Sequence, residues 1–163
     1  MSRTPLVDGA PLPLLDETLT LRVRTGARTV VRRAGAELHL SAPDSGETTL
    51  RAALEHWLRG EARRELPARL AEIGRPLGLR PSRVVVRGQR TRWGSCSSLG
   101  TISLNWRLLL VPSALVDYVL LHELCHLRHL NHSRAFWGLV AAHMPDWAAR
   151  RARLRALQGR LAL

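Results

Sequence analysis

The stretch HELCHLRHLNHSRAFW (residues 122–137) concentrates four histidines, one glutamate and one cysteine ahead of two aromatic residues. On a helix, residues four apart project from one face, so His122 and His126 can bind one ion from two corners of a tetrahedron. Glu123 follows the first of these histidines and lies beside the ion without binding it. This is the HExxH arrangement, in which two imidazoles bind zinc and the carboxylate acts as general base toward water.

A catalytic zinc site needs a third protein ligand, and two histidines compete for that role. If the helix continued, His129 would lie about 10 Å along the axis from His122, too far to share one tetrahedron. His132 follows the turn-prone Asn131, so the chain can reverse and bring this imidazole back to the ion. We therefore predict His132 as the third ligand. The spacing matches HExxHxxGxxH, but His129 replaces the glycine, so the turn must differ because a side chain disfavours a positive φ.

Two other interpretations give the histidines no catalytic role. The helix could carry solvated histidines without a metal, or the metal could be structural, with Cys96 or Cys125 completing a closed coordination shell. Cys125 is adjacent to His126 in the sequence and about 100° round the helix from it, which is a poor position for sharing the ion. We expect Cys125 to be a small buried residue instead.

Aromatic residues flank the histidine cluster. Tyr118 lies one turn before the first histidine on the same face, where it could contact a metal ligand, although a core position is favoured. Ser133 is expected to cap a new helix. Phe136 and Trp137 should pack that helix against the metal helix and so hold His132 in place.

Helix signals recur along the chain. Pro112-Ser113 opens the helix that carries the HExxH motif. Asp146 should cap a final helix that ends at Leu161. A long helix is predicted from Leu50 onward, and Pro67 should kink or split it because proline lacks the backbone donor and clashes with the preceding turn.

Strand signals lie in two regions. Residues 18–43 alternate apolar and polar side chains in three short runs, which indicates an antiparallel meander. Residues 84–86 and 100–106 are predicted to be strands, with residues 93–100 as the loop between them.

Length and composition suit one domain. The chain has 163 residues, of which 45% are hydrophobic, enough for a core of ordinary size. We expect a single domain over residues 1–163, with a strand meander over 1–45 and a catalytic core over 46–163.

The expected compartment is the cytoplasm. No run of 18 apolar residues is present and the N-terminal residues lack the pattern of a signal peptide. The two cysteines are too few for a disulfide framework. We therefore expect a soluble protein with no membrane partner.

Positive charge is concentrated in the second half of the chain. Residues 1–72 carry 11 arginines against 10 acids, whereas residues 73–163 carry 14 arginines against three acids, and lysine is absent. Such a surface attracts polyanions in a salt-dependent way. No acid interrupts the arginines between residues 73 and 116, which are Arg75, Arg80, Arg83, Arg87, Arg90, Arg92 and Arg107.

Three segments together carry a family resemblance. RTRWGSCSSLGTISLNWRLLLVP (residues 90–112), YVLLHELCHLRHLNHSRAFWGLV (118–140) and MPDW (144–147) resemble the YgjP-like metallopeptidases, which are related to the SprT-like and Wss1-like zinc proteases. The resemblance implies an α+β, zincin-like fold, in which a mixed sheet packs on helices and the HExxH helix lies in the core. It also implies that the strand GTISLNW lies near the metal helix.

The same resemblance implies a mechanism. One zinc ion per chain would be bound by His122, His126 and His132, with Glu123 as general base. The SprT-like and Wss1-like relatives cleave proteins that are crosslinked to DNA, and the arginine-rich half would suit DNA-associated substrates.

We therefore expect a zinc-dependent metallopeptidase that acts on peptides or proteins. Arg90, Arg92 and Asn105 are candidates for binding the substrate or a polyanion such as DNA. Two alternatives remain: a hydrolase that uses the same metal on a nucleotide phosphoanhydride, and a non-enzymatic basic module that binds nucleic acid and holds a structural metal.

Overall fold

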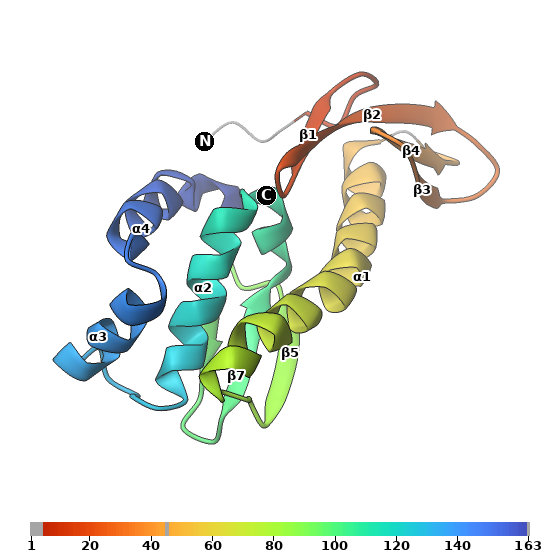
Figure 1. The fold of residues 1–163 in the computed structure, drawn as a ribbon. Coiled ribbons are helices and arrows are strands. Elements are labelled where there is room, and N and C mark those ends of the chain that lie inside the picture. Colours follow the sequence, from red (N-terminus) through yellow and green to blue (C-terminus); the bar gives the residue numbers. More distant parts are fainter. Residues whose placement is uncertain (1–4, 45, 163) are drawn as a thin grey trace.

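The helix with the HELCH sequence, α2 (Ser113–His126), lies at the centre of the molecule in a computed structural model that describes residues 5–44 and 46–162. It is flanked by the long helix α1 (Glu47–Gly74) on one side and by α3 (Arg134–His143) and α4 (Trp147–Ala156) on the other (Figure 1). A four-stranded sheet and a three-stranded sheet complete this α+β fold, as predicted.

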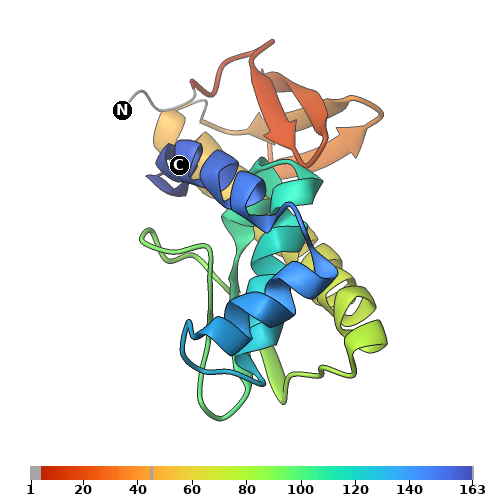
Figure 2. The ribbon, with the colours of Figure 1, turned by 60° about the vertical axis from the view of Figure 1, so that its left-hand side comes forward.

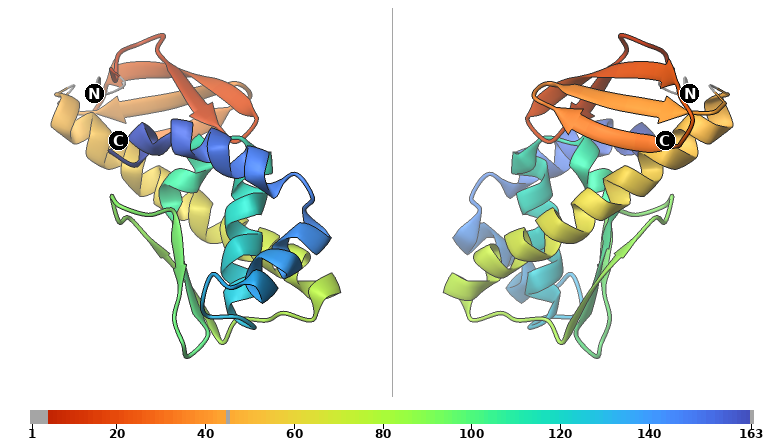
Figure 3. Two further views of the ribbon diagram at one scale, coloured as in Figure 1. Left: turned by 90° about the vertical axis from the view of Figure 1, so that its left-hand side faces the viewer. Right: turned by 90° about the vertical axis from the view of Figure 1, so that its right-hand side faces the viewer.

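The N-terminal sheet covers one end of the molecule (Figure 3). Its strand order is β1-β2-β4-β3, and the sheet contacts the helix α1. Leucines at alternate positions of β2 and β4 point to the core, with exposed fractions of 0–1%. The strands are β1 (Pro11–Leu14), β2 (Glu17–Thr25), β3 (Val30–Ala34) and β4 (Glu37–Ala42).

The predicted antiparallel meander is wrong in one pairing. β1 with β2 and β3 with β4 are antiparallel, but β2 and β4 run parallel, with Leu21 opposite Leu38. The chain after β2 passes to the far edge of the sheet before β4 returns beside β2. β1 was not predicted, because Pro11 and Pro13 weaken a strand pattern and are tolerated only at a sheet edge.

Helix α1 spans the molecule from the N-terminal sheet to the second sheet (Figure 3). It buries a stripe of leucines four residues apart, including Leu54, Leu58 and Leu66, each at most 1% exposed. Of the two outcomes predicted at Pro67, a kink or a split, the split does not occur, because the helix continues through this residue to Gly74. A short 3₁₀ helix, η1 (Arg75–Leu77), follows, and Gly78 ends it with a φ of 65°.

The second sheet has the strand order β5-β7-β6. β5 (Arg83–Arg87) and β7 (Thr101–Asn105) are parallel and occur where strands were predicted. The region predicted as a loop contains a further strand, β6 (Gly94–Cys96), which pairs antiparallel with β7 and contacts α2. The sheet therefore brings an edge strand to the metal helix.

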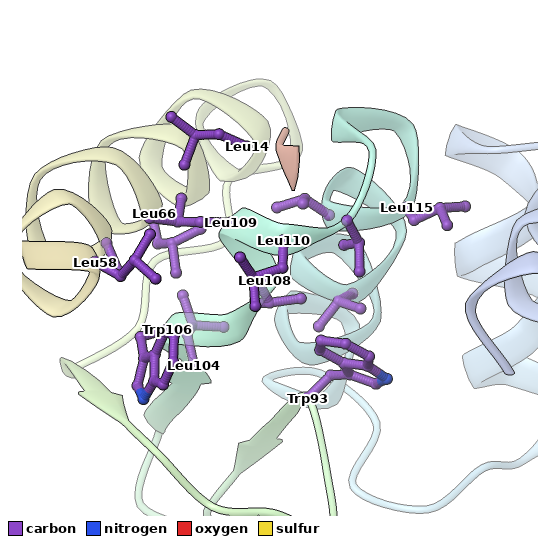
Figure 4. Packing of buried hydrophobic residues seen from close by; sticks show 14 of the residues in the cluster. Leu14, Leu58, Leu66, Trp93, Leu104, Trp106, Leu108, Leu109, Leu110 and Leu115 are labelled. Carbon is purple, nitrogen blue, oxygen red and sulfur yellow. The ribbon is translucent and has the colours of Figure 1, made fainter. Parts of the chain in front are cut away.

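The core joins these elements. After β7 comes the 3₁₀ helix η2 (Trp106–Leu110), whose side chains are all buried. Leu108 and Trp106 belong to the same buried cluster as Leu58 of α1 and Leu104 of β7 (Figure 4). Leucines of the N-terminal sheet belong to the same buried cluster.

Helix capping agrees only partly with prediction. Ser133 caps α3 and its Oγ accepts a hydrogen bond from the Phe136 amide at 3.2 Å. Asp146 lies at the N-cap position of α4, but its carboxylate pairs with Arg150 at 3.0 Å and makes no cap bond. The predicted helix to Leu161 ends at Ala156, and the 3₁₀ helix η3 (Gln158–Ala162) follows.

Within residues 5–44 and 46–162, no helix is both long enough and apolar enough to span a bilayer. Helix α1 has the length, but arginines and glutamates cover its exposed face.

Candidate metal centre

Three imidazoles converge at the C-terminal end of α2. His122 and His126 project from one face of the helix, and His132 returns from the turn that follows it. The Nε2 atom of His126 lies 3.2 Å from that of His122 and 3.0 Å from that of His132. The Nε2 atoms of His132 and His122 are 3.2 Å apart. Among the described residues, these three form the one histidine, cysteine or carboxylate cluster that could hold a metal ion.

This triangle fits a tetrahedral ion. Zinc–imidazole bonds of about 2.0–2.1 Å would separate the nitrogens by about 3.3 Å, close to the observed spacing. Three nitrogen lone pairs that face one point repel one another unless a cation or protons lie between them. The residues present therefore suit zinc and leave a fourth position open, as a catalytic site requires.

Protonation of the rings also favours a cation. The Nδ1 atom of His126 lies 3.0 Å from the backbone oxygen of His129, so Nδ1 carries the proton and Nε2 is free to bind. Burial, together with the neighbouring His126 and His132, lowers the pKa of His122 to about 3. Burial also lowers the pKa of His126. His122 and His126 are therefore neutral at pH 7, which is the form that binds metal.

His129 contributes its backbone and not its ring. Its amide donates to the Cys125 oxygen at 3.0 Å just after the end of α2, and its carbonyl oxygen lies 3.0 Å from Nδ1 of His126. The imidazole of His129 is outside the three-nitrogen cluster. The structure thus brings together the three predicted histidines and excludes the competing one.

Glu123 is buried beside this cluster. Its side chain is 6% exposed, and no hydrogen bond or ion pair to it is found within the described part of the chain. Burial raises the pKa of Glu123 to about 7, and the positive charge of Arg92 opposes this rise. A carboxyl group with a pKa near neutrality is suited to exchange protons with a reacting molecule.

Gly94 of β6 gives Glu123 its space. A Cβ atom at Gly94 would lie 3.2 Å from both Cγ and Oε2 of Glu123 and 3.3 Å from the Ser103 backbone oxygen. The backbone of the edge strand thus passes directly against the carboxylate. Sequence reasoning missed this contact, because a glycine in a short loop pattern carries no signal of what it approaches.

Stacked rings hold the third histidine. His126 stacks on Phe136 with ring centroids 4.4 Å apart, and His132 stacks on Trp137 at 5.7 Å. Trp147 of α4 stacks in turn on Trp137, with ring centroids 4.4 Å apart. Phe136 and Trp137 therefore pack α3 against the metal helix, as predicted.

Tyr118 combines the two roles that were considered for it. Its side chain is 4% exposed, as a core residue would be, and its hydroxyl lies 3.4 Å from Nδ1 of His122. The Tyr118 ring thus packs in the core, while its hydroxyl contacts the His122 imidazole.

The cysteines do not join the cluster. Cys125 is fully buried and Cys96 is half-buried on β6, and both are free thiols. Burial raises the pKa of each thiol to about 11, so neither is a thiolate at pH 7. Among the described residues, no cluster of potential ligands includes a cysteine.

The loop before β6 carries two of the predicted binding residues. Arg92 lies at a cavity of about 270 Å³ that His122 and Glu123 also line. Arg90 is exposed and lies near Arg107, whose pKa burial lowers and Arg90 lowers further.

Asn105 holds this loop from within the fold. It is 3% exposed, and its amide donates to the backbone oxygens of Gln89 and Arg92, the latter at 3.1 Å. Its Oδ1 accepts from the Arg107 amide at 3.0 Å. Asn105 thus positions the loop, and its predicted contact with a substrate or polyanion stays a prediction.

The comparisons with known proteins agree with this geometry. A model of the YgjP-like metallopeptidase domain matches residues 1–157. The chain belongs to the YgjP-like metallopeptidase family. Membership of this family implies a metal, typically zinc, and protein or peptide substrates. Among curated proteins, none matches the chain significantly.

Two solved structures are similar to this YgjP-like chain. The crystal structure of the metallopeptidase zymogen abylysin from Pyrococcus abyssi has 26% identity and a TM-score of 0.51, and the match covers 56% of this chain and 92% of that one. The zymogen jannalysin from Methanocaldococcus jannaschii has 21% identity and a TM-score of 0.49, with 58% and 96% covered. The YgjP-like chain thus shares its zincin-like fold with the abylysin zymogen.

Proposed function

We propose that this chain is a zinc-dependent peptidase in which His122, His126 and His132 hold one zinc ion and Glu123 is the general base. The observation that carries the proposal is the convergence of three imidazole nitrogens at 3.0–3.2 Å, one residue away from a buried carboxylate. Solvated histidines would not point their lone pairs at one another.

Zinc, when bound, supplies a Lewis acid that polarises the carbonyl of the scissile bond. Glu123, which lines the same cavity as His122, takes a proton from the attacking water and delivers it to the leaving amine. Tyr118 and the carbonyl of His129 keep the two helical imidazoles oriented.

The substrate backbone has a place to bind. β6 pairs with β7 on one side only, and its other edge is open within the described chain. An extended peptide that added a strand to this edge would lie next to Glu123, because Gly94 touches that carboxylate.

Glu123→Gln tests the mechanism. The variant should lose hydrolysis of an unfolded, fluorophore-labelled protein by about 10²–10⁴-fold, the usual contribution of a general base. Zinc content, measured by elemental analysis, should stay at about one ion per chain. Full activity in this variant would refute the role of Glu123. Phosphate release from nucleoside triphosphates without peptide cleavage would favour the phosphoanhydride hydrolase instead.

The charge distribution supports a narrower proposal, that substrates are associated with DNA. Exposed arginines precede β6, including Arg83, Arg87 and Arg90. Affinity for duplex DNA should fall steeply between 50 and 200 mM salt, by roughly 10³-fold or more if six phosphates are contacted. Binding that ignores salt would exclude this account. A cytoplasmic location is part of the same proposal.

A further inference from the structure

The cavity next to the metal centre is formed by one face of each of two helices. Tyr118 and His122 contribute from α2, and Arg151 and Arg155 contribute from α4, four residues apart in each case. Helix α4 lies across α2 (Figure 2). The loop before β6 supplies the third wall of the cavity. The cavity has a volume of about 270 Å³.

Three arginines line this cavity: Arg92, Arg151 and Arg155. Arg151 also lies over the Trp137 ring, 5.3 Å from its centroid, which places the guanidinium close to the stacked third histidine. In the described residues, none of these three arginines forms an ion pair with an acid.

The acids that could neutralise them are already engaged. Residues 73–163 contain three acids. Asp117 pairs with Arg69 at 3.2 Å, and Asp146 pairs with Arg150 at 3.0 Å. The third, Glu123, lies buried at the base of the same cavity. The protein thus leaves three guanidinium groups around one concave site with only a buried carboxyl beside them.

One other polar pair of the wall is already engaged. The Trp93 indole nitrogen donates to the Gln158 side chain at 3.2 Å, which ties the loop to η3. The guanidinium groups are therefore the principal donors that remain for a ligand, and their planar arrays of N–H groups match carboxylates.

We propose that this cavity binds an acidic side chain of the peptide substrate, next to the scissile bond. The inference rests on the proposed peptidase function, because it requires a peptide across the metal centre. A cavity of about 270 Å³ is below the roughly 300–1,000 Å³ of sites for drug-sized ligands, so it suits one side chain. Aspartate or glutamate would neutralise the arginine cluster, whereas a basic residue would be repelled.

A peptide library tests the preference. After digestion with the zinc-loaded full chain, cleaved bonds are mapped by mass spectrometry. Asp and Glu should be enriched at one position beside the cleaved bond, and a matched Glu peptide should exceed its Gln analogue by about tenfold in kcat/KM. Cleavage without any acidic preference would overturn the proposal and leave the peptidase function intact.

Two variants assign the preference to the cavity. Arg155→Gln should reduce kcat/KM for the Glu peptide about tenfold and leave the Gln peptide within about twofold. Arg153→Gln, on the same helix but outside the cavity lining, is the control and should retain the full preference. Equal losses on both peptides in Arg155→Gln would indicate a structural role and contradict the proposal.

Binding separates this proposal from the peptidase function. If no peptide is cleaved, the affinity of Glu123→Gln for the fluorescein-labelled Glu and Gln peptides still decides the matter. Tighter binding of the Glu peptide, lost in Glu123→Gln/Arg155→Gln, would support the acidic pocket even without hydrolysis. Equal affinities would reject it.

Discussion

The two nitrogens of the His126 ring have separate tasks. Nδ1 is fixed by the carbonyl of His129, and Nε2 faces the other two imidazoles. The turn that follows α2 therefore orients the last histidine of the helix through the carbonyl of His129. His129 follows Cys125 by one helical turn, so the carbonyl reaches back over the ring.

Two histidine variants distinguish a ring from a backbone contribution. His132→Ala should lose most bound zinc, because two imidazoles cannot complete the site. His129→Ala should retain about one zinc per chain, because its carbonyl remains. Elemental analysis of both purified variants measures this. Zinc retained in His132→Ala and lost in His129→Ala would reverse our assignment of the third ligand.

The sequence predicted the convergence of the three histidines correctly, because one helix and one turn determine their positions. The spacing of four residues fixes His122 and His126 on one face, and Asn131 allows His132 to return. It did not find the arginines of α4, because their approach to the cavity depends on how α4 crosses α2. The burial of Asn105 under the loop could not be predicted for the same reason, since it is set by tertiary packing.

Helix α1 is continuous because the burial of its leucines outweighs the presence of Pro67 in its interior. Leucines at every fourth position give it an apolar stripe, and that packing outweighs the hydrogen bond that Pro67 cannot donate. The leucine pattern predicted this helix correctly. The short strand β6 could not be predicted, because Gly-Ser-Cys has no apolar alternation and its pairing depends on β7.

Two glycines of α1 should respond oppositely to alanine. A Cβ atom at Gly60 meets nothing within 4 Å, so Gly60→Ala should raise the free energy of unfolding by about 0.5–1 kcal/mol. A Cβ atom at Gly74 would lie 2.4 Å from the Leu79 backbone oxygen, so Gly74→Ala should lower it by about 1–3 kcal/mol. Urea unfolding of both variants is the measurement. Destabilisation by Gly60→Ala would show that α1 is not a simple helix there.

At the scale of the molecule, one carboxylate connects the N-terminal sheet to the metal helix. Asp16, between β1 and β2, accepts a hydrogen bond from the Ser113 amide at 2.9 Å and another from its hydroxyl. It thus satisfies a free donor at the start of α2 from a residue far away in the sequence. Sequence reasoning did not detect this contact, because no local pattern joins positions so far apart.

Stability should therefore depend on pH through Asp16. The hydrogen bonds from the Ser113 side chain and backbone hold the pKa of Asp16 below its usual range. Because the folded-state pKa is depressed, this stabilisation is present above pH 4 or so and is lost as the pH falls through the lowered value. Asp16→Ala should lower Tm at pH 7, and the difference from wild type should shrink on acidification.

Asp16→Asn provides the matched control. The amide oxygen can still accept from the Ser113 backbone, but the side chain no longer ionises. Its Tm difference from Asp16→Ala should be nearly independent of pH. A wild-type advantage over Asp16→Ala that persisted unchanged below pH 3 would disprove the link between this carboxylate and acid stability.

The ring stack around the third histidine gives the centre an optical signal of its own. An indole lies face to face with His132, a second indole covers it, and Arg151 lies over the first. The emission of Trp137 is therefore sensitive both to an ion that engages the imidazole and to an anion that draws the guanidinium away. The protein carries a native fluorophore for following metal uptake and substrate capture without an added label.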